Sequence, residues 1–382
     1  MSSKSNRIYY WSPFTGRVAT TRSVVNSAIS IKKFSAKKTN VSIIDCYGEW
    51  NKFSNLFKKN KIKILNLQNK IKINIDTQGF LKSRIIYIIT FFLTYFKLKK
   101  IIKDDKPEYL LIHLLTYIPI LLFFFNNFRT KLVLRISGKP KLTIFRFLLW
   151  KLLSKKIVLV FSPTNETIKY LNDKKVFPYK KIKFLPDPII NDREIKSLKK
   201  NKIKKFFKKN DYYLSIGRLT KQKNHKLLIN TFKKFNFKEN LLIIGNGELK
   251  QKLNQSIKKA KLESSIKIIN YQKNIFKYID NSKGVIVSSL WEDPGFVMVE
   301  AAFSKKIIIS SDCPSGPKEF LGRNKAGFLF KNDNQSSLFS TINMFKKTNK
   351  AGINLKLNKA KEKSKIYTIF NHYKILSKYL KV

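Results

Sequence analysis

The sequence is poor in cysteine, histidine and acidic residues. Its 382 residues include two Cys, three His and 23 Asp and Glu. Cys46 and Cys313 lie far apart, and there is no CxxC pair. These counts exclude a disulfide scaffold and argue strongly against a Cys/His metal site. So few cysteines are typical of a protein in a reducing cytoplasm.

Long uninterrupted apolar runs are also lacking. Residues 85–96 are apolar but too few to cross a bilayer as a helix. Residues 109–128 are numerous enough but include His113 and Pro119, so we expect a buried strand over 109–112, a loop and then a helix, with a membrane-spanning segment as the alternative. The N-terminal residues show no signal-peptide pattern before the strand-like run 7–11. We therefore expect a cytoplasmic protein.

Positive charge is what the sequence has in excess. Lys and Arg number 79, which gives a net charge of +56. The charge is spread evenly: residues 1–190 hold 37 basic and 9 acidic residues, residues 191–382 hold 42 and 14, and each half carries +28. A nucleic-acid-binding protein usually concentrates its charge on one stripe or arm, so we expect no nucleic-acid partner. Codon bias toward A/T explains the Lys, Ile and Asn content, and an anionic surface remains an alternative partner.

Strand-like and helix-like segments alternate along the whole chain, which predicts an α/β fold of parallel sheets. The alternation of strands and helices is interrupted after Pro186-Asp187-Pro188, and seven Lys follow between 199 and 209. We expect two Rossmann-like domains facing a central cleft. Their predicted limits are an N-terminal domain at 1–190, a basic linker at 191–210, a C-terminal domain at 211–365, and a C-terminal helix at 366–382 that packs back on the first domain. The predicted strands are 7–11, 41–45, 62–67, 109–113, 131–137, 157–162, 182–185, 212–216, 241–244, 266–270, 284–287 and 306–310. The predicted helices are 22–33, 164–171, 224–235, 248–261, 296–304, 335–347 and 355–382.

Two glycine-containing turns follow predicted strands of the second half. After strand 212–216 come Gly217, Arg218 and, five residues on, Lys223 at the start of a helix. A tight turn, two cations and a helix N-terminus suit an anion, although a solvated turn is the alternative. After strand 241–244 come Gly245 and Gly247, which would allow close approach of a ligand or of another backbone segment.

Two further junctions complete this set. Glu292 and Glu300 flank the turn before the predicted helix 296–304, and carboxylates there suit sugar hydroxyls. The alternative is that Glu292 caps the helix and Glu300 lies on the surface. In the first half, the loop 13–17 contains Gly16 and has the size of a phosphate-binding turn.

Together these segments resemble glycosyltransferase family 4, whose members are retaining enzymes of the GT-B fold. The resemblance is strong over 212–330. There the sequence reads SIGRLTKQKNHKLLINTF, LLIIGNGELKQKL and SSLWEDPGFVMVEAAFSKKIIISSDCPSGPKEFL, and Glu292 and Glu300 have the spacing of the family's E-x7-E motif. It is looser in the first half, around Gly16, His113 and Leu134–Gly138. The order Asp293-Pro294-Gly295 departs from the family's usual pattern.

The resemblance implies a role for each matching residue. Arg218 and Lys223 would hold the donor diphosphate, Glu292 would contact the transferred sugar, and Glu300 would contact the ribose. Amides near Gly16 and at Gly295, Phe296 and Val297 would complete the phosphate site, beside the Gly245–Gly247 turn. No metal and no separate cofactor would be needed, because fixed cations and amides stabilise the leaving diphosphate.

His113 is a candidate facing the acceptor, with a capping or core role as its alternative. His225 and His372 are expected on helix surfaces or in packing, and Glu319 is expected to be structural. The resemblance implies transfer from a nucleotide-sugar to a saccharide or lipid-linked acceptor. Assembly of bacterial surface polysaccharide or lipopolysaccharide at the inner face of the membrane is the expected setting, with anionic lipid as a peripheral partner. The rivals are an epimerase or hydrolase on the same fold, a relative that only binds, and a basic nucleic-acid-binding protein.

Overall fold

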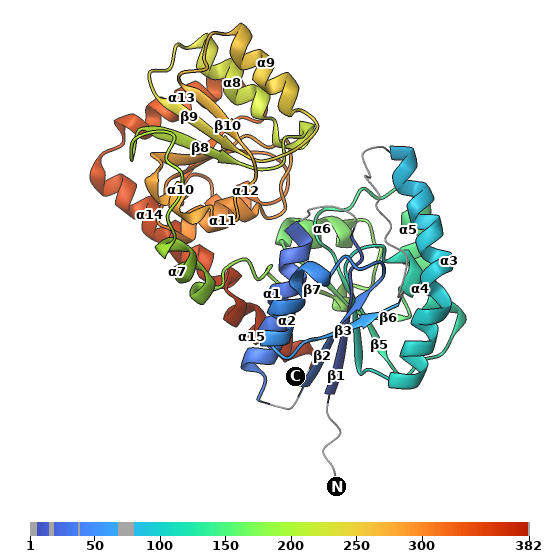
Figure 1. The fold of residues 1–382 in the computed structure, drawn as a ribbon. Helices are drawn as coiled ribbons and strands as arrows, with labels where there is room; N and C mark the ends of the chain where they lie inside the picture. Colours follow the sequence, from blue (N-terminus) through green and yellow to red (C-terminus); the bar gives the residue numbers. More distant parts are fainter. Residues whose placement is uncertain (1–5, 15–18, 37–38, 68–79, 381–382) are drawn as a thin grey trace. The chain divides into compact units, whose positions relative to one another are not determined.

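The computed structural model describes residues 6–14, 19–36, 39–67 and 80–380, with side chains from 88 onward in the last range. It divides the chain into two compact units (Figure 1). The first unit consists of Met1–Pro188 together with Ile369–Val382, and the second is Ile189–Thr368. Residues 191–210, predicted as a linker, therefore lie within the second unit.

The first unit contains a parallel sheet that has, within the described residues, seven strands in the order β3-β2-β1-β4-β5-β6-β7. Alternate side chains of each strand face opposite sides, so that Ile8 and Tyr10 of β1 enter one apolar core and Tyr9 and Trp11 enter the other. Most of the predicted strands are confirmed. The strands are β1 (Asn6–Trp11), β2 (Thr39–Asp45), β3 (Lys63–Asn66), β4 (Tyr109–Ile112), β5 (Lys131–Arg135), β6 (Ile157–Ser162) and β7 (Ile182–Phe184).

Helices cover both faces of this sheet (Figure 1). One face carries α1 (Ala19–Phe34), α2 (Ser54–Lys59) and α15 (Ile369–Leu380), and the other carries α3 (Phe80–Asp105), α4 (Tyr117–Phe125), α5 (Ile144–Leu153) and α6 (Asn165–Asp173). The helix after the strand at 109–112 is confirmed as α4, whereas α3 and α5 were not predicted as helices. No helix among the described residues combines the length and apolar character needed to span a bilayer.

The second unit contains a parallel sheet with the order β10-β9-β8-β11-β12-β13 within the described residues. Tyr212 and Leu214 of β8 face one core and Tyr213 faces the other. The strands are β8 (Tyr212–Ile216), β9 (Asn240–Ile244), β10 (Ile266–Ile269), β11 (Gly284–Val287), β12 (Ile308–Ser311) and β13 (Phe328–Phe330). The short strand β13 was not predicted, and β12 begins two residues later than expected.

Two groups of helices sandwich the second sheet. One face carries α8 (His225–Lys234), α9 (Lys250–Lys259) and α13 (Gln335–Lys347), and the other carries α7 (Asp192–Lys200), α10 (Phe276–Asn281), α11 (Phe296–Phe303), α12 (Pro317–Leu321) and α14 (Lys350–Ser364). Helix α7 belongs to this layer because Ile195 is buried in the core and Leu198 packs against it. The basic residues of α7 thus occupy the solvent side of a packed helix.

The prediction of one continuous helix over 355–382 is wrong. Helix α14 ends at Ser364, a short 3-10 turn covers Lys365–Tyr367, and α15 begins at Ile369. The break is fixed by the distant residue Ile190, whose backbone N–H donates to the carbonyl of Tyr367 at 2.9 Å. Thr368 at the break has extended dihedrals, so the helix cannot continue through it.

Candidate active site

The strand order of each sheet defines where a ligand site is expected. In the second sheet β8 lies between β9 and β11, and in the first sheet β1 lies between β2 and β4, so the order of connection reverses at β8 and at β1. Ligands of open parallel sheets bind beyond the carboxyl ends of the strands at such a reversal. A ligand site of the second unit is therefore expected at the loops after β8 and β11.

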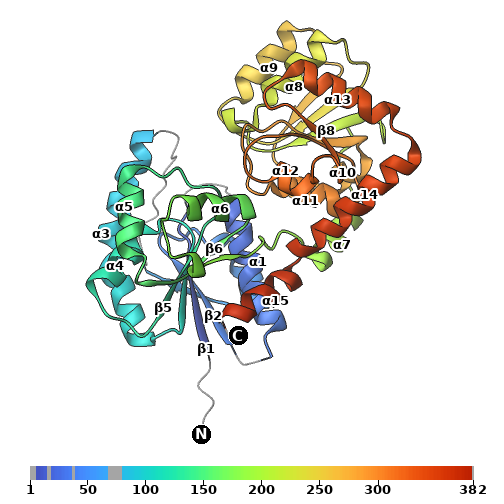
Figure 2. The same cartoon turned by 180° about the vertical axis from the view of Figure 1, so that it is seen from behind.

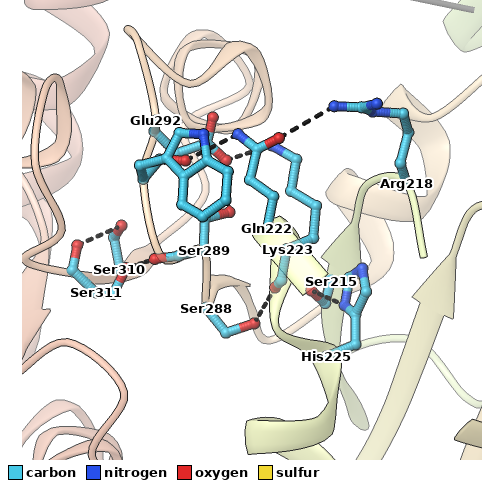
Figure 3. A network of polar contacts seen from close by, with 11 residues as sticks. Ser215, Arg218, Gln222, Lys223, His225, Ser288, Ser289, Glu292, Ser310 and Ser311 are labelled. Atoms are coloured by element: carbon cyan, nitrogen blue, oxygen red, sulfur yellow. Dashed lines mark hydrogen bonds and ion pairs between the residues drawn. The ribbon is translucent and has the colours of Figure 1, made fainter. Parts of the chain in front are cut away.

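The centre of this region is an ion pair between Lys223 and Glu292 (Figure 3). Lys223 ends the 3-10 turn after β8, and Glu292 lies in the loop after β11. The Glu292 carboxylate also accepts a hydrogen bond from the Ser289 hydroxyl at 2.5 Å. The Glu292 side chain is 8% exposed and that of Lys223 is 19% exposed, so the pair is largely removed from water. A lysine has three N–H donors, which leaves two of those on Lys223 for another anion.

Arg218 lies beside this pair on the exposed side of the same loop. Its guanidinium donates to the side-chain oxygen of Gln222 at 3.0 Å, and the Gln222 amide donates to the Trp291 carbonyl at 3.0 Å. The chain of bonds connects the loop after β8 to the loop after β11 (Figure 3). Arg218 is thus oriented while its other donors face solvent, an arrangement that suits a phosphate.

Serine hydroxyls fix the loop that carries Glu292. The Ser288 hydroxyl donates to the backbone carbonyl of Lys223 at 2.9 Å, which ties the loop that carries Glu292 to the turn that carries Lys223. Ser311, at the end of β12, donates to the carbonyl of Ser289 at 2.6 Å. These bonds hold the carboxylate in place before any ligand arrives, so little reorganisation of this loop is needed on binding.

His225 is a packing residue, as expected, and is buried rather than on the surface. It begins α8, directly after the left-handed residue Asn224, and its Nδ1 lies 3.3 Å from the Ser215 hydroxyl. Burial first, and then the neighbouring Lys223 charge, lower the pKa of His225 to about 4. The ring is therefore neutral at physiological pH and adds no charge beneath the site.

Gly245 and Gly247 make room for protein backbone. A Cβ atom on Gly245 would lie 1.8 Å from the carbonyl oxygen of Gly217, and one on Gly247 would lie 2.4 Å from that of Leu219. The loop after β9 therefore packs directly on the loop that carries Arg218. Of the two possibilities, close approach of a ligand or of a backbone segment, the structure shows the second.

Gly295 and Glu300 belong to helix α11. Gly295 caps its N-terminus with a φ of +94°, and a Cβ there would lie 3.6 Å from the Cβ of Glu292. The helix start, with the free amides expected at Phe296 and Val297, thus adjoins the Glu292 loop. Glu300 is only 2% exposed, so the alternative of a surface residue is wrong.

The first unit contains its own polar cluster at the carboxyl edge of β1, β4 and β5. His113 follows β4, is 7% exposed, and neither ring nitrogen has a hydrogen-bond partner among the described residues. Burial, with further contributions from Arg135 and His372, lowers the pKa of His113 well below its usual value. The hydroxyls of Ser12 and Ser137 are also buried there and unpartnered within the described chain.

A buried ion pair that sequence analysis missed supports this edge. Arg135, at the end of β5, donates to Asp187 at 2.8 Å, and both side chains are at most 5% exposed. Ser23 of α1 also donates to Asp187, at 2.5 Å. His372 is a packing residue here, because its ring bonds Ser27 at 2.8 Å and the Pro186 carbonyl at 2.7 Å. A charged residue within an apolar strand was the available signal for Arg135.

The remaining predicted positions lie elsewhere. Gly16 falls outside the described residues. Glu319 lies in the short helix α12, and its structural role stays a prediction. Across the part of the chain that the structure describes, no group of three or more His, Cys, Asp or Glu could hold a metal ion.

Parts of the chain are similar in sequence to known glycosyltransferases. Residues 197–364, less than half of the chain, match the family model described as "Glycosyl transferases group 1". An uncharacterised glycosyltransferase of Methanocaldococcus jannaschii is 31% identical over 251 residues, which are 59% of this chain and 61% of that protein. An N-acetylgalactosamine-N,N'-diacetylbacillosaminyl-diphospho-undecaprenol 4-alpha-N-acetylgalactosaminyltransferase of Campylobacter jejuni is 31% identical over 159 residues, or 42% of this chain and 43% of that one. The matched segments thus cover about three fifths of the length of the first of these proteins and under half of the length of the second.

Solved structures extend the likeness to the whole fold. The crystal structure of Anabaena HepE in complex with UDP superposes with a TM-score of 0.72 at 13% identity, covering 99% of both chains. At such low identity the likeness concerns the fold alone. The chain therefore has the two-domain GT-B fold of glycosyltransferases, and its residues 197–364 are similar to the group 1 glycosyl transferases.

Proposed function

We propose that the protein is a retaining glycosyltransferase of family 4 type, which transfers a sugar from a nucleotide diphosphate donor to a saccharide or lipid-linked acceptor. The observation that carries the proposal is the Lys223–Glu292 pair beside Arg218, at the strand-order reversal of a domain similar to group 1 glycosyl transferases. The solved relative with UDP bound and the Campylobacter jejuni relative, named for a diphospho-undecaprenol acceptor, support this donor and acceptor class.

In this proposal the cations act on the leaving group. As the bond from sugar to diphosphate breaks, the acceptor hydroxyl oxygen bonds to the anomeric carbon on the same face, and a phosphate oxygen of the leaving diphosphate takes the hydroxyl proton. Negative charge grows on the phosphate oxygens during this step. Arg218 donates a bidentate pair of hydrogen bonds, Lys223 adds a point charge while staying bonded to Glu292, and amides at Phe296 and Val297 face the same phosphates. No metal ion is required for that stabilisation.

The carboxylates would select the donor. Glu292, held by Ser289, accepts hydrogen bonds from hydroxyls of the transferred sugar, and Glu300 accepts them from the ribose. In the first unit, the neutral His113 ring is proposed to form a hydrogen bond with the acceptor substrate, as donor or as acceptor of that bond. Both ring nitrogens lack a protein partner among the described residues. Surface polysaccharide or lipopolysaccharide assembly at the cytoplasmic face of the membrane is the proposed setting.

Thermal shift with UDP, GDP, ADP and a panel of nucleotide sugars, without metal, tests the donor site. A nucleotide at 100 times its dissociation constant should stabilise the second unit by about 2.7 kcal/mol. Arg218→Ala and Glu300→Ala should abolish the shift. A shift that survives both substitutions contradicts the assigned site. Short DNA as the sole stabilising ligand would instead favour the nucleic-acid-binding alternative.

The reaction type is tested with the nucleotide sugar that binds. NMR of the product formed on a saccharide acceptor should show the anomeric configuration of the donor retained. Inversion of that configuration contradicts the retaining assignment. Turnover of the donor at the same rate without acceptor identifies an epimerase or hydrolase.

A further inference from the structure

Exposed apolar side chains gather on three neighbouring helices of the first unit. Helices α3, α4 and α5 cover the same face of the sheet, α3 contacts α4 and α4 contacts α5 (Figures 1 and 2). On α3 the side chains of Ile88, Phe92 and Phe96 are 59%, 69% and 72% exposed. We call the solvent side of these three helices the apolar helix face. Exposed apolar side chains on three neighbouring helices are unusual, because soluble proteins rarely expose such side chains contiguously.

Helix α5 continues this surface. Phe145, Leu148 and Leu152 follow one another at intervals of three and four residues and are 73%, 51% and 71% exposed. That spacing places them on one side of the helix. Between α3 and α5, helix α4 ends with the exposed pair Phe124 and Phe125.

The same helices also bury apolar side chains against the sheet. Leu98 and Ile102 of α3, and Trp150 and Leu153 of α5, belong to the core. These helices thus have two apolar sides, one packed against the sheet and one exposed to solvent. A helix that is apolar all round is typical of a protein interior or of contact with lipid.

Cationic side chains border the apolar helix face. Lys97 and Lys100 follow Phe96 on the exposed part of α3, and Arg146 and Lys151 are exposed on α5. Helices α4 and α5 contain no acidic residue. Long cationic side chains of this kind hold their charge at the level of lipid phosphates while neighbouring apolar side chains enter the acyl boundary.

We infer that the apolar helix face docks on an anionic bilayer surface, with Phe92, Phe96 and Phe145 inserted among the lipids. Charge decides between a bilayer and a second copy of this chain: each copy carries +56, so pairing would bring like charges together. Nucleic acid matches the charge but offers nothing comparable to the apolar side chains. The inference rests on the membrane setting of the proposed function and names the surface that makes the contact. Vesicle binding needs no donor or acceptor, so its failure is distinguishable from a failure of the proposed sugar transfer.

Vesicle flotation tests the inference with the full chain. Phosphatidylcholine vesicles containing 30% phosphatidylglycerol should carry the protein, and pure phosphatidylcholine vesicles should carry less. The double variant Phe92→Ser/Phe96→Ser should bind at least roughly tenfold more weakly. Lys97→Glu/Lys100→Glu should weaken binding most at low salt, because its contribution is screened at high salt.

A matched control variant distinguishes binding through this face from non-specific hydrophobic adsorption to vesicles. Met344 and Leu355, in the second unit, are 55% and 56% exposed. Met344→Ser/Leu355→Ser should leave vesicle binding unchanged, and all variants should retain the melting temperature. Absence of flotation, equal loss in the control variant, or flotation that the two Phe substitutions do not weaken would overturn the inference. A wild-type dimer that these substitutions make monomeric, without vesicle binding, would assign the face to self-association instead.

Discussion

Replacing Lys223 by Met should destabilise the second unit strongly. The Glu292 side chain is 8% exposed and its donors among the described residues are Lys223 and Ser289, so the substitution leaves a buried charge with one neutral donor there. Removing one partner of a buried pair costs about 3 kcal/mol or more. For a unit of this length, that corresponds to a fall of about 6–12 °C in melting temperature. Met keeps the aliphatic stem of the side chain, so the loss is one of charge.

Calorimetry of the matched variants measures this effect. Lys318 pairs with Asp312 at 3.5 Å in the same unit, but these side chains are 62% and 31% exposed, so Lys318→Met should cost less than about 1 kcal/mol. Glu292→Gln combined with Lys223→Met should recover most of the stability, because no unpaired charge remains. Equal melting temperatures for Lys223→Met and Lys318→Met would refute the reasoning that burial governs the cost.

Three further outcomes follow from the geometry. Gly245→Ala should lower the free energy of unfolding by about 2–3 kcal/mol and weaken nucleotide binding, because its Cβ would lie 1.8 Å from the Gly217 carbonyl oxygen; urea unfolding and thermal shift report the two effects. The free energy of unfolding of the second unit should fall by up to about 3 kcal/mol as pH falls from about 6.5 to 4. Its one histidine, His225, has a pKa lowered to about 4 in the folded state, so the unfolded chain takes up a proton at higher pH than the folded chain does. His225→Asn should remove that part of the pH dependence measured by urea unfolding. Arg135→Met should destabilise the first unit by about 3 kcal/mol in calorimetry, since Asp187 would lose its buried cation.

Each of these three outcomes has a contradicting result. A Gly245→Ala variant as stable as a Gly284→Ala variant would show that the loops can separate freely, since a Cβ on Gly284 would lie 3.3 Å from its nearest backbone atom. An unchanged pH dependence in His225→Asn would assign the loss of stability to carboxylates. A stable Arg135→Met protein would mean that Asp187 is satisfied by Ser23 alone.

Local patterns predicted most strands and the second-unit site. Short apolar runs such as Tyr212–Ile216, alternating with helix-like segments, indicate buried parallel strands, and Arg218, Lys223 and Glu292 follow strand ends in the sequence itself. The structure brings these three side chains together through the hydrogen bonds of Gln222 and through the ion pair between Lys223 and Glu292. The pattern of alternating strands and helices was enough to predict this site, because each of the three residues follows in sequence the strand that positions it.

Other features depend on contacts that sequence patterns do not encode. Arg135 and Asp187 pair across 52 positions, and Ile190 ends a helix at Tyr367 through a bond between distant segments. Helices α3 and α5 were missed because both of their sides are apolar, which removes the contrast between faces that identifies an amphipathic helix.

The return of α15 to the first unit has a consequence for synthesis. Leu376 and Leu380 belong to the core that contains Val24 and Phe161, yet the ribosome makes them only after the whole second unit, Ile189–Thr368. The second unit is therefore contiguous and complete when its last residue emerges, whereas the first must wait with part of its apolar core uncovered. The domain translated first finishes folding last, and that interval is when chaperones would be needed.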